Sequence, residues 1–231
     1  MQLYAVIVAG GFGKRMDAEI PKQFLELAGR PILMHTIERF KAFDDSIEII
    51  TVLPENQLRH WFDLQEKHSF KIVHTLVKGG ASRYDSVKNG LEFVNAPGLV
   101  AIHDGVRPFV TLDTISRCFV EAEKAGNAIP VISPSDSLRM VTEKGSIPVD
   151  RRQVRQVQTP QVFSAELIKK AYSQNYSHGF TDDATVFEMN GGIINLVEGN
   201  RENIKITNPE DLLIAQVFLS GICPPTPLKG G

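Results

Sequence analysis

The chain has 231 residues, of which 42% are hydrophobic and 23% charged, and its formal net charge is −2. That balance is ordinary for a globular domain, and it argues against a protein that binds nucleic acid or an anionic membrane through bulk charge. The two cysteines, Cys118 and Cys223, form neither a disulfide framework nor a metal-spaced set, so we expect a reducing, cytoplasmic setting. Since no apolar run reaches transmembrane length, we expect no membrane span.

Short apolar runs alternate with amphipathic stretches along most of the chain. The helix signals fall at the matching places, because Pro31 precedes one amphipathic stretch, Ser82 can cap another and Gly126 can end a third. We expect strands over residues 3–8, 47–53, 71–77, 99–103, 128–132 and 193–197, and helices over residues 32–43, 55–68, 83–94, 112–125, 182–189 and 208–219. This alternation predicts an α/β fold with a Rossmann-like, mostly parallel sheet and helices on both faces.

The alternation of strands and helices stops after residue 133. Leu138 and Met140 alternate with polar residues and a turn follows, so we expect a protruding β-hairpin arm at about residues 136–157. An isolated hairpin is marginally stable in water, so the arm should lie on its own domain or on a partner subunit. Residues 1–220 are expected to form one domain that includes this arm, and residues 221–231 a disordered tail.

A glycine-rich loop, residues 10–13, follows the first predicted strand and precedes Lys14 and Arg15. The backbone amides of such a turn can point at phosphate oxygens, and the two cations add charge. A dinucleotide fingerprint would need glycine in place of Met16, and a Walker A loop would need Ser or Thr in place of Arg15. The loop by itself is therefore either a tight strand-to-helix turn or a phosphate site of another kind.

Two further segments follow predicted strands, residues 79–83 and residues 104–108. Ligands of an open parallel sheet bind at the carboxyl ends of its strands, where these segments would meet the glycine loop. Glycine loops, cations and the carboxylate of Asp104 would then share one edge. That combination fits a nucleoside triphosphate with Mg²⁺, which prefers one or two carboxylates plus phosphate oxygens.

Eight short motifs occur in order along the chain, and together they resemble the 2-C-methyl-D-erythritol 4-phosphate cytidylyltransferase family from about residue 3 to residue 219. They are Ala9-Gly10-Gly11-x-Gly13-x-Arg15-Met16, Pro21-Lys22-Gln23, Gly79-Gly80-x-x-Arg83-x-x-Ser86-Val87, His103-Asp104-x-x-Arg107-Pro108, Asp150-Arg151, Gln158-Thr159-Pro160-Gln161, Thr181-Asp182-Asp183-Ala184 and Asn203-Ile204-Lys205-Ile206-Thr207.

The resemblance implies transfer of CMP from CTP to 2-C-methyl-D-erythritol 4-phosphate, with release of pyrophosphate, in non-mevalonate isoprenoid biosynthesis. It implies Mg²⁺ as cofactor and a homodimer formed through the arm. The matching positions suggest Arg15 and Lys22 as the catalytic cations, Asp104 as the metal ligand, and Ala9, Gly10, Gly11, Gly13, Gly80 and Ser86 as the nucleotide site. They further suggest Arg107, Thr181 and Lys205 near the polyol phosphate and the α-phosphate, with Arg151 and Thr159 reaching the polyol phosphate from the partner's arm.

Three alternatives stay open at this point. Gly10 and residues 105–106 are variants that also occur in ribitol-5-phosphate cytidylyltransferases, whereas residues 181–184 favour the methylerythritol enzyme. A dinucleotide-dependent oxidoreductase is disfavoured by Met16, where packing against the sheet calls for glycine. A non-catalytic nucleotide-binding module would not need all three of Arg15, Lys22 and Asp104.

Overall fold

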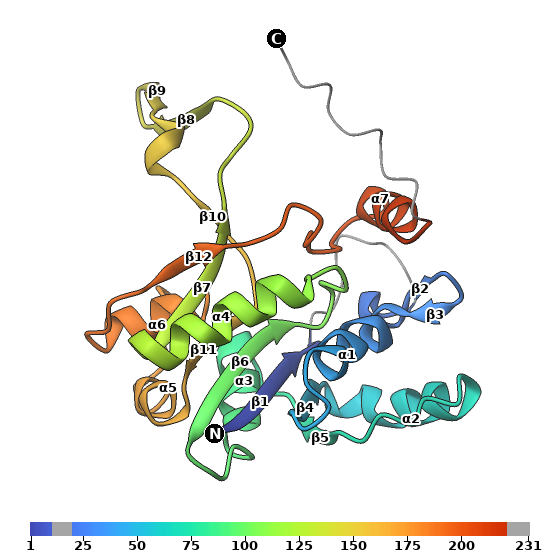
Figure 1. The fold of residues 1–231 in the computed structure, drawn as a ribbon. Coiled ribbons are helices and arrows are strands. Elements are labelled where there is room, and N and C mark those ends of the chain that lie inside the picture. The colour runs from blue at the N-terminus through green and yellow to red at the C-terminus, as the bar shows by residue number, and fades with distance from the viewer. Residues whose placement is uncertain (11–19, 221–231) are drawn as a thin grey trace.

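The centre of the fold is an eight-stranded sheet, and the computed structural model describes residues 1–10 and 20–220. Its strands are β1 (Gln2–Val8), β4 (Glu48–Leu53), β5 (Thr75–Lys78), β6 (Gly98–Asp104), β7 (Asn127–Ile132), β10 (Gln156–Val157), β11 (Gln161–Ser164) and β12 (Leu196–Glu198). They lie in the order β10-β7-β11-β6-β1-β4-β5, and β12 pairs with β7 (Figure 1). The strands β6, β1, β4 and β5 are mutually parallel, whereas β11 is antiparallel to both β6 and β7.

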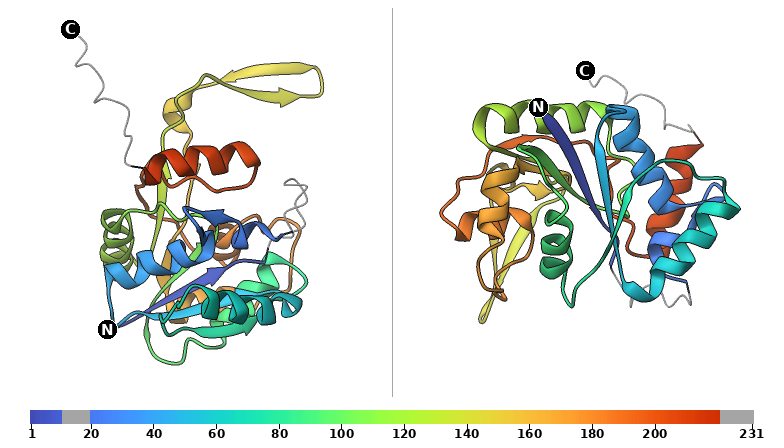
Figure 2. Two further views of the ribbon diagram at one scale, coloured as in Figure 1. Left: turned by 90° about the vertical axis from the view of Figure 1, so that its right-hand side faces the viewer. Right: turned by 90° about the horizontal axis from the view of Figure 1, so that it is seen from below.

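Helices cover both faces of this sheet, as Figure 1 and the view from below in Figure 2 show. They are α1 (Ile32–Phe43), α2 (Leu58–Lys67), α3 (Arg83–Leu91), α4 (Leu112–Ala125), α5 (Ala165–Ala171), α6 (Asp183–Met189) and α7 (Pro209–Leu219). Along β1, Ala5 and Ile7 pack with α1 and α4, whereas Tyr4 and Val6 pack with α3 and α5. Side chains of a strand alternate between the two faces, so one apolar run serves both cores. The expected fold class is confirmed.

Several predicted element bounds differ from the structure. The strand expected from residue 71 begins at Thr75, since His74 Nδ1 bonds the carbonyl of Ile72 and its Nε2 accepts from Trp61 Nε1. The helix expected over residues 55–68 begins with the short 3₁₀ helix η2 (Glu55–Gln57). Sequence analysis assigned neither β11 nor α5, which join without a turn. It also missed the small hairpin of β2 (Glu26–Leu27) and β3 (Arg30–Pro31), which follows η1 (Lys22–Phe24).

The predicted arm is present as a separate two-stranded sheet of β8 (Leu138–Thr142) and β9 (Gly145–Val149). It projects away from the main sheet on the side of α7, as the left view of Figure 2 shows. Its apolar side chains are exposed, with Met140 at 53% and Val141 at 85%. The arm is shorter than the expected range 136–157. It ends before η3 (Arg151–Gln153), and β10 pairs with β7 in the main sheet.

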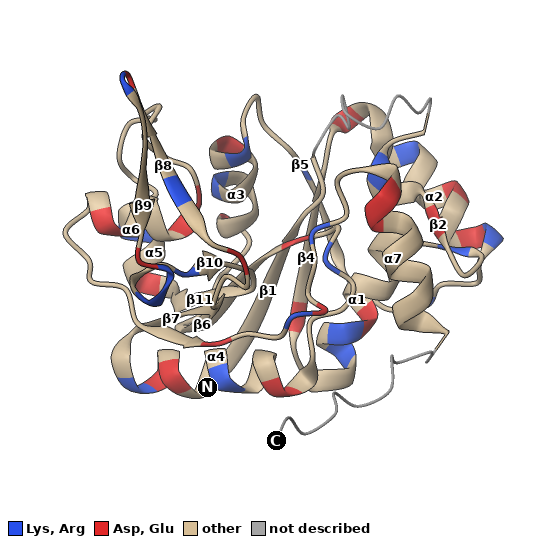
Figure 3. Cartoon of the chain, turned by 90° about the horizontal axis from the view of Figure 1, so that it is seen from above, with Lys and Arg blue, Asp and Glu red and all other residues tan. Residues whose placement is uncertain are grey.

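Helix α7 packs on a third, smaller apolar cluster beside the end of β6. Leu27, Val106, Phe109 and Ile206 form this cluster with Ala215 of the helix. Charged residues of both signs are interspersed over the helices and the arm (Figure 3). Within residues 1–10 and 20–220, no helix is long and apolar enough to cross a membrane. The tail expected over residues 221–231 lies outside the described residues.

Candidate active site

A cavity of about 260 Å³ lies where β1 and β6 end. Seven of the residues that sequence analysis selected line it: Ala9, Gly10, Lys22, Gly80, Ser86, Asp104 and Lys205. They come from five separate segments, which the parallel strands bring to one edge of the sheet. The predicted site residues Gly11, Gly13 and Arg15 lie outside the described residues.

The wall at the start of α3 is a tight turn that depends on glycine. A Cβ on Gly80 would come within 2.3 Å of the Cβ of Asp85, so no other residue fits without a shift of the backbone. The Gly80 N–H donates to Ser86 Oγ at 3.1 Å, and Ser86 Oγ donates to the Ser82 carbonyl at 2.9 Å. Ser82 and Asp85 form a capping box that fixes the first turn of α3. This wall therefore presents backbone groups in a rigid arrangement.

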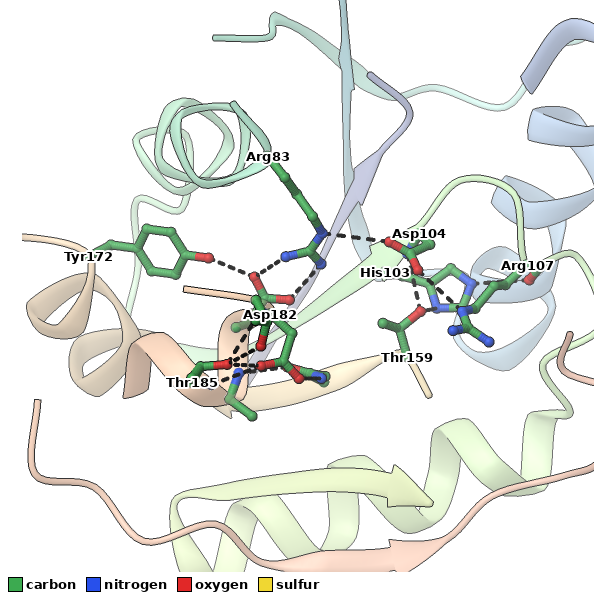
Figure 4. A network of polar contacts seen from close by, with 12 residues as sticks. Arg83, His103, Asp104, Arg107, Thr159, Tyr172, Asp182 and Thr185 are labelled. Atoms are coloured by element: carbon green, nitrogen blue, oxygen red, sulfur yellow. Dashed lines mark hydrogen bonds and ion pairs between the residues drawn. The ribbon is translucent and has the colours of Figure 1, made fainter. Parts of the chain in front are cut away.

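Asp104, at the end of β6, is held by three cations, and Figure 4 shows two of them, Arg83 and Arg107. Its Oδ2 lies 3.0 Å from Lys205 Nζ and 3.2 Å from Arg107 Nε, and its Oδ1 lies 3.6 Å from Arg83 Nε. Burial favours the protonated carboxyl, but the charges of Arg83, Lys205 and Arg107 outweigh it and hold the pKa of Asp104 well below its ordinary value. The cavity thus keeps one permanent anion among several cations.

A buried chain of hydrogen bonds lies behind Asp104. The Thr159 hydroxyl accepts from the Asp104 N–H at 3.1 Å and lies 3.0 Å from His103 Nδ1, while His103 Nε2 lies 3.1 Å from the Arg107 carbonyl. Burial lowers the pKa of His103 to about 4, so the ring is neutral, and this network assigns its proton to Nε2. Thr159 then donates its only hydroxyl proton to His103.

The structure places Thr159 outside the arm, whereas its expected contact with the partner's polyol phosphate stays a prediction. Thr159 is 5% exposed and lies between β10 and β11, where it contacts Asp104 of the same chain. Its backbone carbonyl also accepts from Asn203 Nδ2 at 2.8 Å. Thr159 therefore fixes the end of β6, and its position is not on the arm.

Three other predicted residues do not line the cavity. Arg107 lies beside it, bonded to Asp104 and, through Nη1, to the Asn203 carbonyl at 2.8 Å. Thr181 is exposed, and its hydroxyl lies 2.8 Å from that of Thr185. Arg151 is exposed in η3 at the base of the arm.

Arg83 also lines the cavity, although its motif did not predict a role for it. Its Nη1 and Nη2 donate to the two oxygens of Asp183 at 2.8 and 2.7 Å, and Asp183 is fully buried. The signal available in the sequence was a cation at the first position of a helix that follows a glycine turn. Its partner could not be seen there, because Asp183 lies 100 positions further along the chain.

Comparisons with known proteins agree with this geometry. Residues 3–221 match the family described as 2-C-methyl-D-erythritol 4-phosphate cytidylyltransferase. The chain is 51% identical over 219 residues to the protein of that name from Bacteroides thetaiotaomicron, covering 95% of this chain and all of the relative. It is 53% identical to the one from Bacteroides fragilis over 93% of this chain and 98% of the relative.

Solved structures show the same similarity. A 4-diphosphocytidyl-2C-methyl-D-erythritol synthase from Anaerococcus prevotii superposes with a TM-score of 0.81 at 28% identity, over 95% of this chain and 96% of that one. The 2-C-methyl-D-erythritol 4-phosphate cytidylyltransferase from Thermus thermophilus gives a TM-score of 0.77 at 29% identity, over 95% of this chain and all of that one.

Proposed function

The chain belongs to the 2-C-methyl-D-erythritol 4-phosphate cytidylyltransferase family, and we propose that the cavity beside Asp104 is where its two substrates react. The enzyme transfers CMP from CTP to 2-C-methyl-D-erythritol 4-phosphate in the non-mevalonate route to isoprenoids. The observation that supports this location is that three cations surround Asp104 next to the rigid turn at Gly80.

The reaction needs positioning and charge more than proton transfer. An oxygen of the polyol phosphate attacks the α-phosphorus of CTP, and the bond from that phosphorus to the pyrophosphate oxygen breaks. Because the attacking phosphate is already anionic, no general base is required. Lys22 and Lys205 line the cavity and would meet the negative charge that develops on the α-phosphate. The backbone at Gly80 and the hydroxyl of Ser86 would contact the cytidine.

Asp104 is the residue that would hold Mg²⁺. Among the described residues no group of three or more His, Cys, Asp or Glu side chains could hold a metal alone, so substrate phosphate oxygens and water would complete the shell. Asp104 fits this role, because its Oδ2 carries two close cations whereas Oδ1 has its nearest cation at 3.6 Å. When bound, Mg²⁺ would neutralise charge on the triphosphate.

The second subunit of a homodimer would complete the site. The arm exposes Met140, Val141 and Ile147, which a two-fold exchange of arms would bury. Arg151 at its base would then reach the neighbour's polyol phosphate. Mixed Lys22→Ala and Arg151→Ala dimers, formed at random from equal amounts, should recover about a quarter of all sites. Absence of recovery after confirmed subunit exchange would place Arg151 outside the neighbour's site.

We assign residues 1–220 to one functional domain and the enzyme to the cytoplasm, in keeping with the buried thiol of Cys118.

Pyrophosphate release tests the assignment. CTP with 2-C-methyl-D-erythritol 4-phosphate should support turnover, and ribitol 5-phosphate should support far less. Comparable rates with both acceptors would contradict the assigned substrate, and no turnover with either would contradict the activity.

A further inference from the structure

Asp183 is a fully buried carboxylate with three donors. Besides the two terminal nitrogens of Arg83, it accepts from Tyr172 Oη at 2.6 Å. Burial and the nearby charge of Asp183 raise the pKa of Tyr172 well above its ordinary value, so its hydroxyl stays protonated and donates. A bidentate pair of arginine and carboxylate in a buried setting is among the strongest polar contacts in proteins.

The helix that carries Asp183 is itself fixed to the sheet. Asp182 caps α6 by accepting from the Thr185 N–H at 2.9 Å. Gln161 of β11 donates to Asp182 Oδ2 at 2.8 Å and accepts from the Ala184 N–H at 2.7 Å. Since Arg83 is likewise the first residue of a capped helix, both members of the pair stand on rigid supports. Figure 4 shows Arg83 between this cluster and Asp104.

The pair determines how Arg83 meets Asp104. With Nη1 and Nη2 bound to Asp183, only Nε faces Asp104, and its 3.6 Å separation from Oδ1 is longer than a hydrogen bond. A guanidinium prefers to bind a carboxylate with two parallel hydrogen bonds. Asp104 is the other carboxylate with which Arg83 forms an ion pair, so it would receive these donors if Asp183 lost its charge.

We propose that Asp183 is a positioning residue for the reaction. It binds both terminal nitrogens of Arg83, so these nitrogens cannot form hydrogen bonds with Asp104. Oδ1 of Asp104 therefore stays available to Mg²⁺. The inference rests on the proposed role of Asp104 as the metal ligand.

The test is the magnesium requirement of Asp183→Asn, which keeps the shape of the side chain and removes its charge. The Mg²⁺ concentration for half-maximal pyrophosphate release should rise about tenfold or more, the usual effect of losing a residue that orients a metal ligand. In calorimetry, the gain in CTP affinity on adding Mg²⁺ should shrink to match. Tyr172→Phe, which removes one donor from Asp183, should shift both quantities in the same direction by less.

The matched control is Glu38→Gln, because Glu38 forms a bidentate pair with Arg30 outside the residues that line the cavity. It should leave the magnesium requirement unchanged. The double variant Arg83→Gln with Asp183→Asn removes the guanidinium together with its partner, and it should return the requirement to near the wild-type value.

Two results would overturn the inference: an Asp183→Asn enzyme with the wild-type magnesium requirement, or a double variant as impaired as the single one. If Asp183→Asn does not fold, as thermal melting would show, Tyr172→Phe decides the question, and a wild-type magnesium requirement in that variant would overturn the inference. Failure of the proposed site is a distinct outcome, because Asp104→Asn would then keep its magnesium-dependent turnover.

Discussion

Replacing Asp104 with asparagine is the most informative single change in this enzyme. Asparagine keeps the volume and one oxygen acceptor, but it removes the negative charge that Lys205, Arg107 and Arg83 share at 3.0 to 3.6 Å. Two consequences follow. The metal loses its protein ligand, and three cations are left facing one another.

The expected magnitudes follow from these contacts. Loss of a preorganised charge that acts on the transition state lowers kcat by about a hundredfold or more. Because the Asp104 side chain is only 10% exposed, removing one partner of its ion pairs should also cost about 3 kcal/mol of unfolding free energy, the lower end of the range for a buried pair.

The stability difference should depend on pH in a defined direction. The pKa of Asp104 is depressed in the folded state, so its contribution is complete above the unfolded-state pKa of about 4 and is lost as the pH falls below it. The wild-type advantage over Asp104→Asn should therefore shrink below pH 4, by about 1.4 kcal/mol per pH unit.

Two assays check these expectations. Pyrophosphate release at saturating CTP and polyol phosphate, with Mg²⁺ varied, measures the first, and urea unfolding between pH 3 and pH 7 measures the second. Turnover within a few-fold of wild type would show that Asp104 is not the metal ligand. A stability difference that does not change with pH would refute the electrostatic account of the site.

Other substitutions test separate parts of the site. Lys22→Ala should lower kcat about a hundredfold with little change in the KM for CTP, and a pure KM effect would assign Lys22 to ground-state binding. Gly80→Ala should raise the KM for CTP about tenfold, because the new Cβ would overlap Asp85 and shift the turn. An unchanged KM would show that the turn tolerates a side chain at this position. Thr159→Val should cost about 2 kcal/mol of unfolding free energy, since the Asp104 N–H and a buried ring nitrogen lose their partner. The exposed Thr181→Val is its control in the same denaturation experiment, and equal effects would contradict the role given to Thr159.

Sequence patterns predicted the parallel core and the position of Asp104 well, because both depend on local regularities. Asp104 is the last residue of an apolar run, so its carboxylate lies at the carboxyl end of that strand, whichever strands the run pairs with. The short strand β11 was missed because its four residues run directly into α5, with no turn between the two elements. Its pairing with β6 and β7 comes from tertiary contacts that no local pattern contains.

The partners of Asp183 and Thr159 could not be predicted from the sequence, for one physical reason. Asp183 has the sequence signature of an acid in the first turn of a helix, where the helix dipole favours negative charge. Its burial and its bond to Arg83 arise from contact between α3 and α6, which are far apart in the chain. Thr159 was likewise assigned through its motif, whereas its hydrogen bond to Asp104 spans 55 positions. Partners at such separations are set by the fold.

The central claim is that the substrates react beside Asp104, and a crystal structure with CTP and Mn²⁺ in place of Mg²⁺ tests it most directly. Anomalous scattering would locate the metal. We expect it about 2 Å from Oδ1 of Asp104, with the cytosine against the turn at Gly80 and the triphosphate toward Lys22. A metal and triphosphate bound elsewhere, with Asp104 still paired only to its cations, would contradict the account.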